Sequence, residues 1–223
     1  MFHSFINKTK RGLTDLYIKY TKPPFLYFLE PEHKRVAFVV PAKVGGTSIR
    51  RWLWIVTYGE EYRGSSLHEC IPFCYSRKLP SSVLRVVAVH RNGVERMRST
   101  YDHRVKKERE AEDKGILFFA SNLSEYSKTH PSVAHHAKAQ YYWLGDNPSL
   151  YTDIIPLQNI NLLPEILSDV MGKNLPEVPR MHVTKEKTEI DDKTALLFEK
   201  WTEEDVRIGW NGTLVKGRII GMR

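Results

Sequence analysis

Two apolar segments, each followed by a loop that begins a helix, constrain this chain more than any other feature of its sequence. The first covers residues 36–48, VAFVVPAKVGGTS, and the second covers residues 86–103, VVAVHRNGVERMRSTYDH. A continuous apolar run is typical of a strand that is buried on both faces of a parallel sheet. The two segments therefore predict a repeated strand–loop–helix unit and favour an α/β fold.

The rest of the chain continues this alternation. We expect strands at 36–40, 83–89 and 154–157, and helices that begin near Thr47 and at 93, 133–144, 162–170 and 194–201. This order predicts one three-layer α/β domain over residues 1–223, with a central parallel sheet flanked by helices. Residues 1–34 are expected to form an N-terminal arm, and residues 111–132 a variable, partly helical insertion.

Composition narrows the class of protein and of partner. With 41% hydrophobic residues, the chain can form a substantial core, and it lacks the run of about eighteen apolar residues that predicts a membrane span. Charges interrupt the N-terminal residues, which do not resemble a signal peptide, so we expect a cytoplasmic protein. The formal net charge of +8 indicates an anionic partner, and a nucleotide, a nucleic acid or an anionic glycan would each fit.

The loop after the first apolar run has the chemistry of a phosphate site. Gly45 and Gly46 allow backbone amides to approach an anion, and Lys43, Thr47 and Ser48 add an ammonium group and two hydroxyls. Thr47 or Ser48 can cap the following helix, whose N-terminal dipole favours negative charge. The loop differs from a Walker A motif, because Lys43 precedes the glycines instead of the Ser/Thr pair. A plain Gly-Gly turn would also fit this segment alone.

The second loop offers a further anion site. Arg91 stands at the end of the second expected strand, where an open parallel sheet binds its ligands, and Ser99 follows on the next helix. Their guanidinium and hydroxyl groups could hold one phosphate. Taken alone, Arg91 and Arg96 could equally be structural residues in salt bridges, and Ser99 an exposed helical serine.

Together the two loops resemble those of PAPS-dependent sulfotransferases, in particular the carbohydrate sulfotransferase type. In that family, P-K-[TV]-[GA]-G-T-S after a strand binds the 5′-phosphosulfate, and R-[DN]-P-x-x-R-x-x-S-x-[YF] binds the 3′-phosphate. The matching residues are Lys43, Gly45, Gly46, Thr47 and Ser48 in the first motif, and Arg91, Asn92, Arg96, Ser99 and Tyr101 in the second. Ala42 separates the proline and lysine that are adjacent in the family, and Gly93 replaces its proline. Weaker similarity extends to QYYWLG at 140–145 and WTEEDVRIG at 201–209.

The resemblance implies a P-loop-like fold and an activity. The chain would transfer the sulfuryl group of PAPS, 3′-phosphoadenosine 5′-phosphosulfate, to an acceptor hydroxyl by in-line displacement, with no metal ion required. Lys43 would stabilise the leaving oxygen, and Arg91 and Ser99 would hold the 3′-phosphate. The residues expected to bind the 5′-phosphosulfate are Lys43, Val44, Gly45, Gly46, Thr47 and Ser48.

The expected general base is His68, in GSSLHECIPF between the two loops, where similar enzymes carry a histidine. An imidazole with an ordinary pKa of about 6.5 suits proton abstraction at neutral pH. The adjacent Glu69 is an alternative base, and Asp102 and His103 either lie near the acceptor or belong to a helix surface. Neighbouring helical residues cannot share a face, so His135 and His136 predict no metal site.

The resemblance favours a carbohydrate as the acceptor, whereas lipids, peptide tyrosines and small alcohols remain open. Two other classes of function also remain: a P-loop-like phosphotransferase or NTP hydrolase, and a basic module that binds a polyanion without catalysis. A kinase would need a Walker lysine and a carboxylate for magnesium, and neither can be assigned in the sequence. The basic residues are dispersed among acidic ones, so we expect no nucleic-acid partner.

Overall fold

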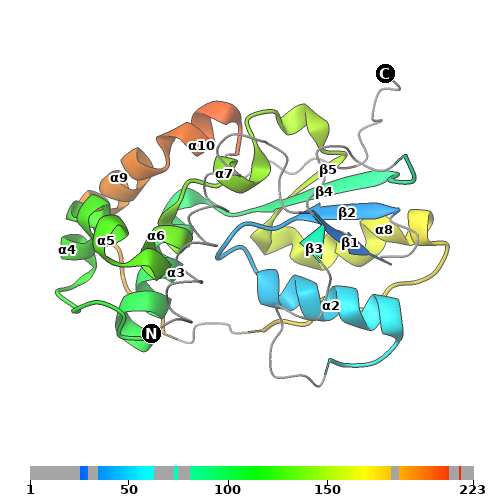
Figure 1. Cartoon of the computed structure of the whole chain (residues 1–223), viewed down its shortest axis with the longest axis horizontal. Coiled ribbons are helices and arrows are strands. Elements are labelled where there is room, and N and C mark those ends of the chain that lie inside the picture. The colour runs from blue at the N-terminus through cyan, green and yellow to red at the C-terminus, as the bar shows by residue number, and fades with distance from the viewer. Residues whose placement is uncertain are drawn as a thin grey trace, which may run out of the picture.

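The computed structural model describes residues 26–29, 35–62, 73–74, 81–181, 186–210 and 216. Its centre is a five-stranded sheet with the strand order β3-β1-β2-β4-β5 (Figure 1). The strands are β1 (Leu26–Leu29), β2 (Val36–Val39), β3 (Phe73–Cys74), β4 (Arg85–His90) and β5 (Asp153–Pro156). Helices accompany this sheet, so the fold is α/β as expected. No helix in the described residues is long and apolar enough to cross a membrane.

The expectation of a parallel sheet is correct only for β2, β4 and β5, which pair in parallel. β1 pairs antiparallel with β2, and β3 pairs antiparallel with β1, so the sheet is mixed. The expected N-terminal arm over residues 1–34 is therefore wrong at β1, which is part of the sheet. Four residues are too few for a distinct period-two pattern, which explains why the sequence did not reveal this strand.

The three parallel strands are buried on both faces. On one face, Phe38 and Val87 pack with side chains of α2 (Gly46–Tyr58) and α8 (Leu163–Met171). On the other face, Val39 and Val86 pack with Trp143 and Leu144 of α7 (Tyr141–Leu144), and with Trp210. Successive strand residues point to opposite faces, so burial of both faces requires the continuous apolar runs seen in the sequence.

A third apolar cluster lies at one end of the sheet, where several short helices gather (Figure 1). These are α3 (Gly93–Thr100), α4 (Ile116–Ser121), α5 (Leu123–Thr129), α6 (Pro131–Ala137), α9 (Asp192–Trp201) and a π-helix, η1 (Tyr101–Lys107). Met97, Tyr101 and Val105 are buried in this cluster, as their four-residue spacing indicated. Residues 111–132 add Phe119 and Leu123 to the same cluster, so the expected insertion contributes to the core. The remaining elements are α10 (Glu203–Ile208) and the 3₁₀-helices η2 (Pro148–Leu150) and η3 (Leu157–Leu162).

The single helix expected at 133–144 is wrong, because the chain leaves the helix between Ala137 and Tyr141. The fully buried Arg96 donates hydrogen bonds to the carbonyls of His136, at 2.8 Å, and Lys138. These donors satisfy carbonyls that the interrupted helix leaves free. The interruption also places Gln140 beside the end of β4, where it contacts Arg91.

Candidate functional site

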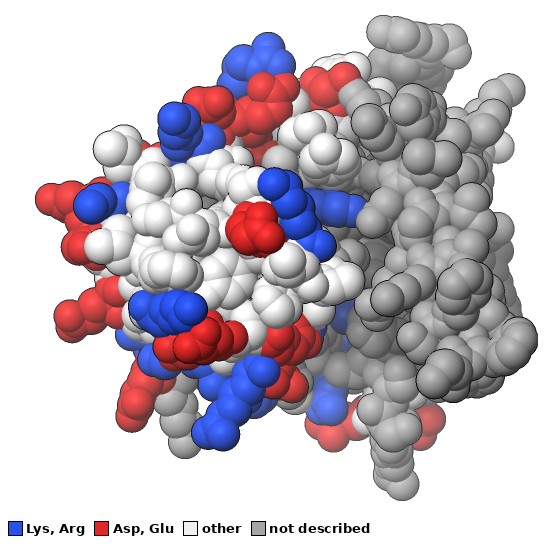
Figure 2. Space-filling model, turned by 60° about the vertical axis from the view of Figure 1, so that its left-hand side comes forward, with Lys and Arg blue, Asp and Glu red and all other residues white. Residues whose placement is uncertain are grey.

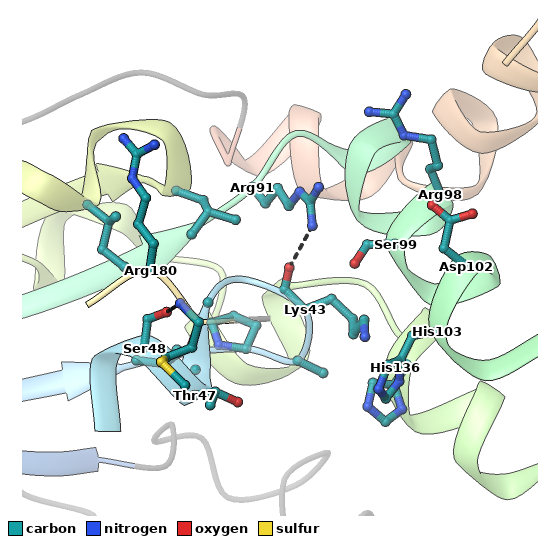
Figure 3. Close-up of a pocket in the computed structure, with 18 of the residues that line it drawn as sticks. Lys43, Thr47, Ser48, Arg91, Arg98, Ser99, Asp102, His103, His136 and Arg180 are labelled. Atoms are coloured by element: carbon teal, nitrogen blue, oxygen red, sulfur yellow. Dashed lines mark hydrogen bonds between the residues drawn. The ribbon is translucent and has the colours of Figure 1, made fainter. Parts of the chain in front are cut away.

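The two loops singled out by the sequence face one cavity of about 1040 Å³ (Figure 3). The loop between β2 and α2 forms one side of the cavity, and α3 with η1 forms another. Residues 157–161, after β5, and residues 179–181 contribute further lining. The structure thus brings together Lys43, Gly45, Gly46, Thr47, Ser48, Arg91 and Ser99.

Gly45 shapes the start of α2. The helix begins at Gly46 with Gly45 as its N-cap, two or three residues earlier than the cap expected at Thr47 or Ser48. Gly45 has a φ of +82°, and a Cβ there would lie 2.6 Å from Leu157 Cδ1. The positive φ favours glycine, and any larger residue would also displace the end of the Leu157 side chain. Because Gly45 has no side chain to accept from the first amides of α2, these donors and the positive end of the helix dipole remain available to an anion.

Lys43 adopts an uncommon backbone conformation directly after Ala42, the residue that separates it from Pro41. Its φ of 65° lies in the left-handed region, which non-glycine residues rarely occupy and which is concentrated at functional sites. Its side chain points across the cavity toward η1 (Figure 3). Burial, followed by the positive charges of Arg104 and Arg91, lowers the pKa of Lys43 to about 8. Bound negative charge would relieve this repulsion.

Arg91 is held from two directions. Its Nη1 donates to the Lys43 carbonyl at 3.2 Å, and its Nη2 lies 3.5 Å from Glu95 Oε2. Its main-chain N–H donates to Gln140 Oε1 at 2.9 Å, and Gln140 Nε2 donates back to the Arg91 carbonyl at 2.9 Å. The backbone of Arg91 is therefore fixed by a two-point amide contact.

Gln140 is positioned in turn by Asp205. The Asp205 carboxylate accepts hydrogen bonds from the main-chain N–H groups of Gln140 and Tyr141, each at 2.9 Å. Gln140 and Asp205 come from the two later segments that resemble the family pattern, at 140–145 and 201–209. The sequence indicated these segments without a role, and the structure links both to Arg91.

The other motif residues have different surroundings. Ser99 lines the cavity on α3 near Arg91 (Figure 3), whereas the Ser48 hydroxyl accepts a hydrogen bond of 3.0 Å from the Met181 N–H. The Val44 side chain is buried in the core, so only its backbone can serve a ligand. Tyr101 is buried as well and donates to Asp113 Oδ1 at 2.5 Å. Val44 and Tyr101 thus contribute to packing.

The π-helix η1 adds cavity residues to which the sequence gave little weight. Asp102, His103, Arg104 and Lys107 line the cavity from this segment. π-Helical turns are rare and often occur at functional sites. Burial, followed by the positive charges of Lys43 and Arg104, lowers the pKa of His103 to about 4, so its imidazole is neutral at pH 7.

His136 is neutral too, and its tautomer follows from its contacts. Its Nδ1 lies 2.7 Å from the Ser132 carbonyl, and its Nε2 lies 2.9 Å from Arg104 Nη2. A carbonyl can only accept and a guanidinium can only donate, so Nδ1 carries the proton and Nε2 accepts. Burial lowers the pKa of His136 to about 2.

His68 and Glu69, the two candidate bases, lie outside the described residues. Within the described ranges, no three His, Cys, Asp or Glu side chains gather in a way that could hold a metal ion.

The chain was also compared with known proteins. No protein-family model, no curated protein and no solved structure matches it. The functional assignment therefore depends on the motifs and on the cavity that contains them.

Proposed function

We propose that this protein is a sulfotransferase that moves the sulfuryl group of PAPS to an acceptor hydroxyl, on a P-loop-like scaffold. One observation carries the proposal. Two loops, each between a parallel strand and a helix, present anion-binding groups to the same cavity, and Arg91 bonds to Lys43 between them. A nucleotide with phosphate groups at both ends would engage both loops.

The proposed binding mode divides the nucleotide between the loops. The 5′-phosphosulfate would lie at the N-terminus of α2, where main-chain amides and the Thr47 hydroxyl face the cavity. The 3′-phosphate would be held by Arg91 and Ser99. Gln140 supports this second contact, because it fixes the backbone from which the Arg91 side chain extends.

The proposed reaction is a single displacement at sulfur. The acceptor oxygen forms a bond to sulfur while the bond from sulfur to the 5′-phosphate oxygen breaks, and adenosine 3′,5′-bisphosphate leaves. Negative charge grows on the departing oxygen, so a fixed cation there stabilises the transition state more than the ground state. Lys43 is suited to this role, because it follows β2 in a constrained loop and extends into the cavity.

The acceptor proton requires a base. His68 remains our candidate from the resemblance. The described part of the cavity adds His103, whose neutral ring lines it. Burial and nearby cations lower the pKa of His103 to about 4, so it would serve as a base only when the negative charge of the bound nucleotide raises that pKa. We likewise propose, from the resemblance, that the acceptor is a carbohydrate.

A thermal-shift comparison tests this function against the two alternatives. We expect adenosine 3′,5′-bisphosphate to stabilise the protein without magnesium, and adenosine, the control, to have little effect. Stabilisation by ATP with magnesium but not by the bisphosphate would indicate a phosphotransferase or NTP hydrolase instead. Stabilisation by a polyanion such as heparin, with no response to either nucleotide, would indicate a non-catalytic module.

A further inference from the structure

Two arginines of the cavity share one carboxylate. Arg91 Nη2 lies 3.5 Å from Glu95 Oε2, and Arg98 Nη2 contacts both oxygens of the same carboxylate. The side chains of Arg91 and Arg98 are 17% and 16% exposed, and both residues line the cavity. Glu95 is 38% exposed and is not among the described residues that line it. Glu95 therefore bridges two cavity cations from outside the cavity.

The spacing of these residues explains the bridge. Glu95 stands four residues after Arg91 and three before Arg98, and residues three or four apart lie on one face of a helix. The main-chain N–H of Glu95 donates to the side chain of Asn92, the N-cap of α3, at 3.2 Å. A negative charge is favourable in this first turn. Glu95 is thus well anchored, and within the described part of the chain it is the only ion-pair partner of Arg98.

The pairing with Glu95 holds Arg98 away from the phosphate-binding groups. The Arg98 guanidinium extends away from Ser99 and Lys43 (Figure 3), although Arg98 directly precedes Ser99 in α3. Two guanidiniums that reach one carboxylate can also reach one phosphate group, which offers more charge and more acceptor oxygens. The position of Glu95 between Arg91 and Arg98 therefore indicates that both arginines can bind a single anion.

We propose that Glu95 is an internal competitor of the anion that binds Arg91 and Ser99, and that Arg98 exchanges from Glu95 to this anion. The proposal rests on the proposed function, because it takes the anion to be the 3′-phosphate of the nucleotide. It adds Arg98 to that site as a further ligand. A phosphate monoester with two negative charges outcompetes a carboxylate with one, and the broken ion pair lowers the net affinity.

Calorimetric titration of the full chain with adenosine 3′,5′-bisphosphate tests the exchange. Glu95→Gln keeps the size of the side chain and removes its charge, which releases both arginines. We expect affinity to rise by about three- to tenfold, the effect of two partly exposed ion pairs. In the Glu95→Gln background, Arg98→Ala should remove most of this gain. In the wild-type background the same replacement should cost less, because Arg98 no longer has an ion pair to break.

Glu125→Gln on α5 is the matched control. Positive and negative side chains intermingle over the outer face of the helices (Figure 2), and Glu125 lies 3.8 Å from Lys128. Removal of this charge should leave bisphosphate affinity nearly unchanged. Equal gains in Glu125→Gln and Glu95→Gln would overturn the proposal, because net charge alone would explain them.

The sign of the change separates competition from support. If Glu95 merely positioned Arg91, its loss would weaken bisphosphate binding, so unchanged or weaker binding by Glu95→Gln would overturn the proposal. Equal effects of Arg98→Ala in the two backgrounds would likewise exclude the exchange.

Inorganic pyrophosphate, an anion without a nucleoside, distinguishes failure of this proposal from failure of the proposed function. If the wild type binds the bisphosphate and Glu95→Gln binds it no more tightly, only the competition is wrong. The opposite outcome is that no variant binds the bisphosphate, while pyrophosphate binds more tightly to Glu95→Gln and loses that gain with Arg98→Ala. The competition then stands and the sulfotransferase function fails. If neither ligand binds any of these proteins, both proposals are wrong.

Discussion

The Arg91 guanidinium donates a hydrogen bond of 3.2 Å to the main-chain carbonyl of Lys43, and this bond joins the two loops at the cavity. Arg91 follows β4, and Lys43 lies between β2 and α2. The parallel strands β2 and β4 are neighbours in the sheet, so both loops emerge at their carboxyl ends. Residues almost fifty positions apart therefore line one cavity.

Replacement of Lys43 should impair turnover more than nucleotide affinity. Loss of one preorganised donor at a developing anion commonly lowers rate by about a hundred- to a thousandfold. For Lys43→Ala we expect a loss of this size in the release of adenosine 3′,5′-bisphosphate from PAPS, with water as the acceptor. Lys128→Ala is the charge control. Turnover at the wild-type rate in Lys43→Ala would exclude this lysine from the chemistry.

Nucleotide affinity should depend on the protonation of Lys43. Its pKa in the nucleotide-free protein is about 8, and bound phosphates should raise it. Binding then takes up a proton, so affinity for the bisphosphate should fall as pH rises above 8, by at most about tenfold per pH unit. Titrations at pH 7.5 and 9.5 measure this fall. The Lys43→Ala variant should largely lose the dependence, and an identical pH slope in both proteins would refute the assignment.

The base can be identified by a pair of histidine variants. General-base catalysis contributes about a hundred- to ten-thousandfold in rate. We expect either His68→Ala or His103→Ala to lose turnover of PAPS by such a factor, with affinity for the bisphosphate preserved. His135→Ala, which changes another cavity histidine, is the control. If both variants turn over PAPS at the wild-type rate, neither His68 nor His103 is the base.

Packing accounts for Gly93, which stands where the sulfotransferases that the chain resembles carry a proline. A Cβ at this position would lie 2.1 Å from Thr202 Oγ1, so the start of α3 tolerates no side chain. Overpacking of this kind costs about 1–3 kcal/mol, and we expect Gly93→Ala to lower the free energy of unfolding by that amount in urea titrations. In a double-mutant cycle, the Gly93→Ala/Thr202→Gly variant should lose less free energy of unfolding than the sum of the losses in the two single variants. Full additivity would show that Thr202 does not impose the glycine.

The sequence predicted the elements whose causes are local. Buried parallel strands need continuous apolar residues, so β2, β4 and β5 are legible in a single sequence. The features that the sequence did not predict depend on contacts between residues that are far apart in the chain. The break after Ala137 requires Arg96 on α3, and the short strand β1 is defined by its pairing with β2.

The same division applies to the site. The two loops after β2 and β4 were predicted from residues within each motif. The role of Gln140 was not, because it depends on contacts with Arg91 and Asp205, which are 49 and 65 positions away in the chain. The π-helix η1 was not predicted either, since the spacing of Met97, Tyr101 and Val105 fits an ordinary helix equally well.

The proposal that the two loops bind the two ends of one nucleotide is tested most directly by calorimetric titration. The ligands are adenosine 3′,5′-bisphosphate and adenosine 5′-monophosphate, which lacks the 3′-phosphate. A charge-assisted hydrogen bond contributes about 1.5–3 kcal/mol, equivalent to about ten- to a hundredfold in affinity. We expect Arg91→Ala to lose such a factor for the bisphosphate and to bind the monophosphate nearly as wild type does. Ser99→Ala should show the same selectivity with a smaller loss, and the exposed Arg207→Ala should show neither effect. Equal weakening of both nucleotides in Arg91→Ala and Ser99→Ala, or equal affinity of the wild type for both nucleotides, would contradict the assignment of these loops to two ends of one nucleotide.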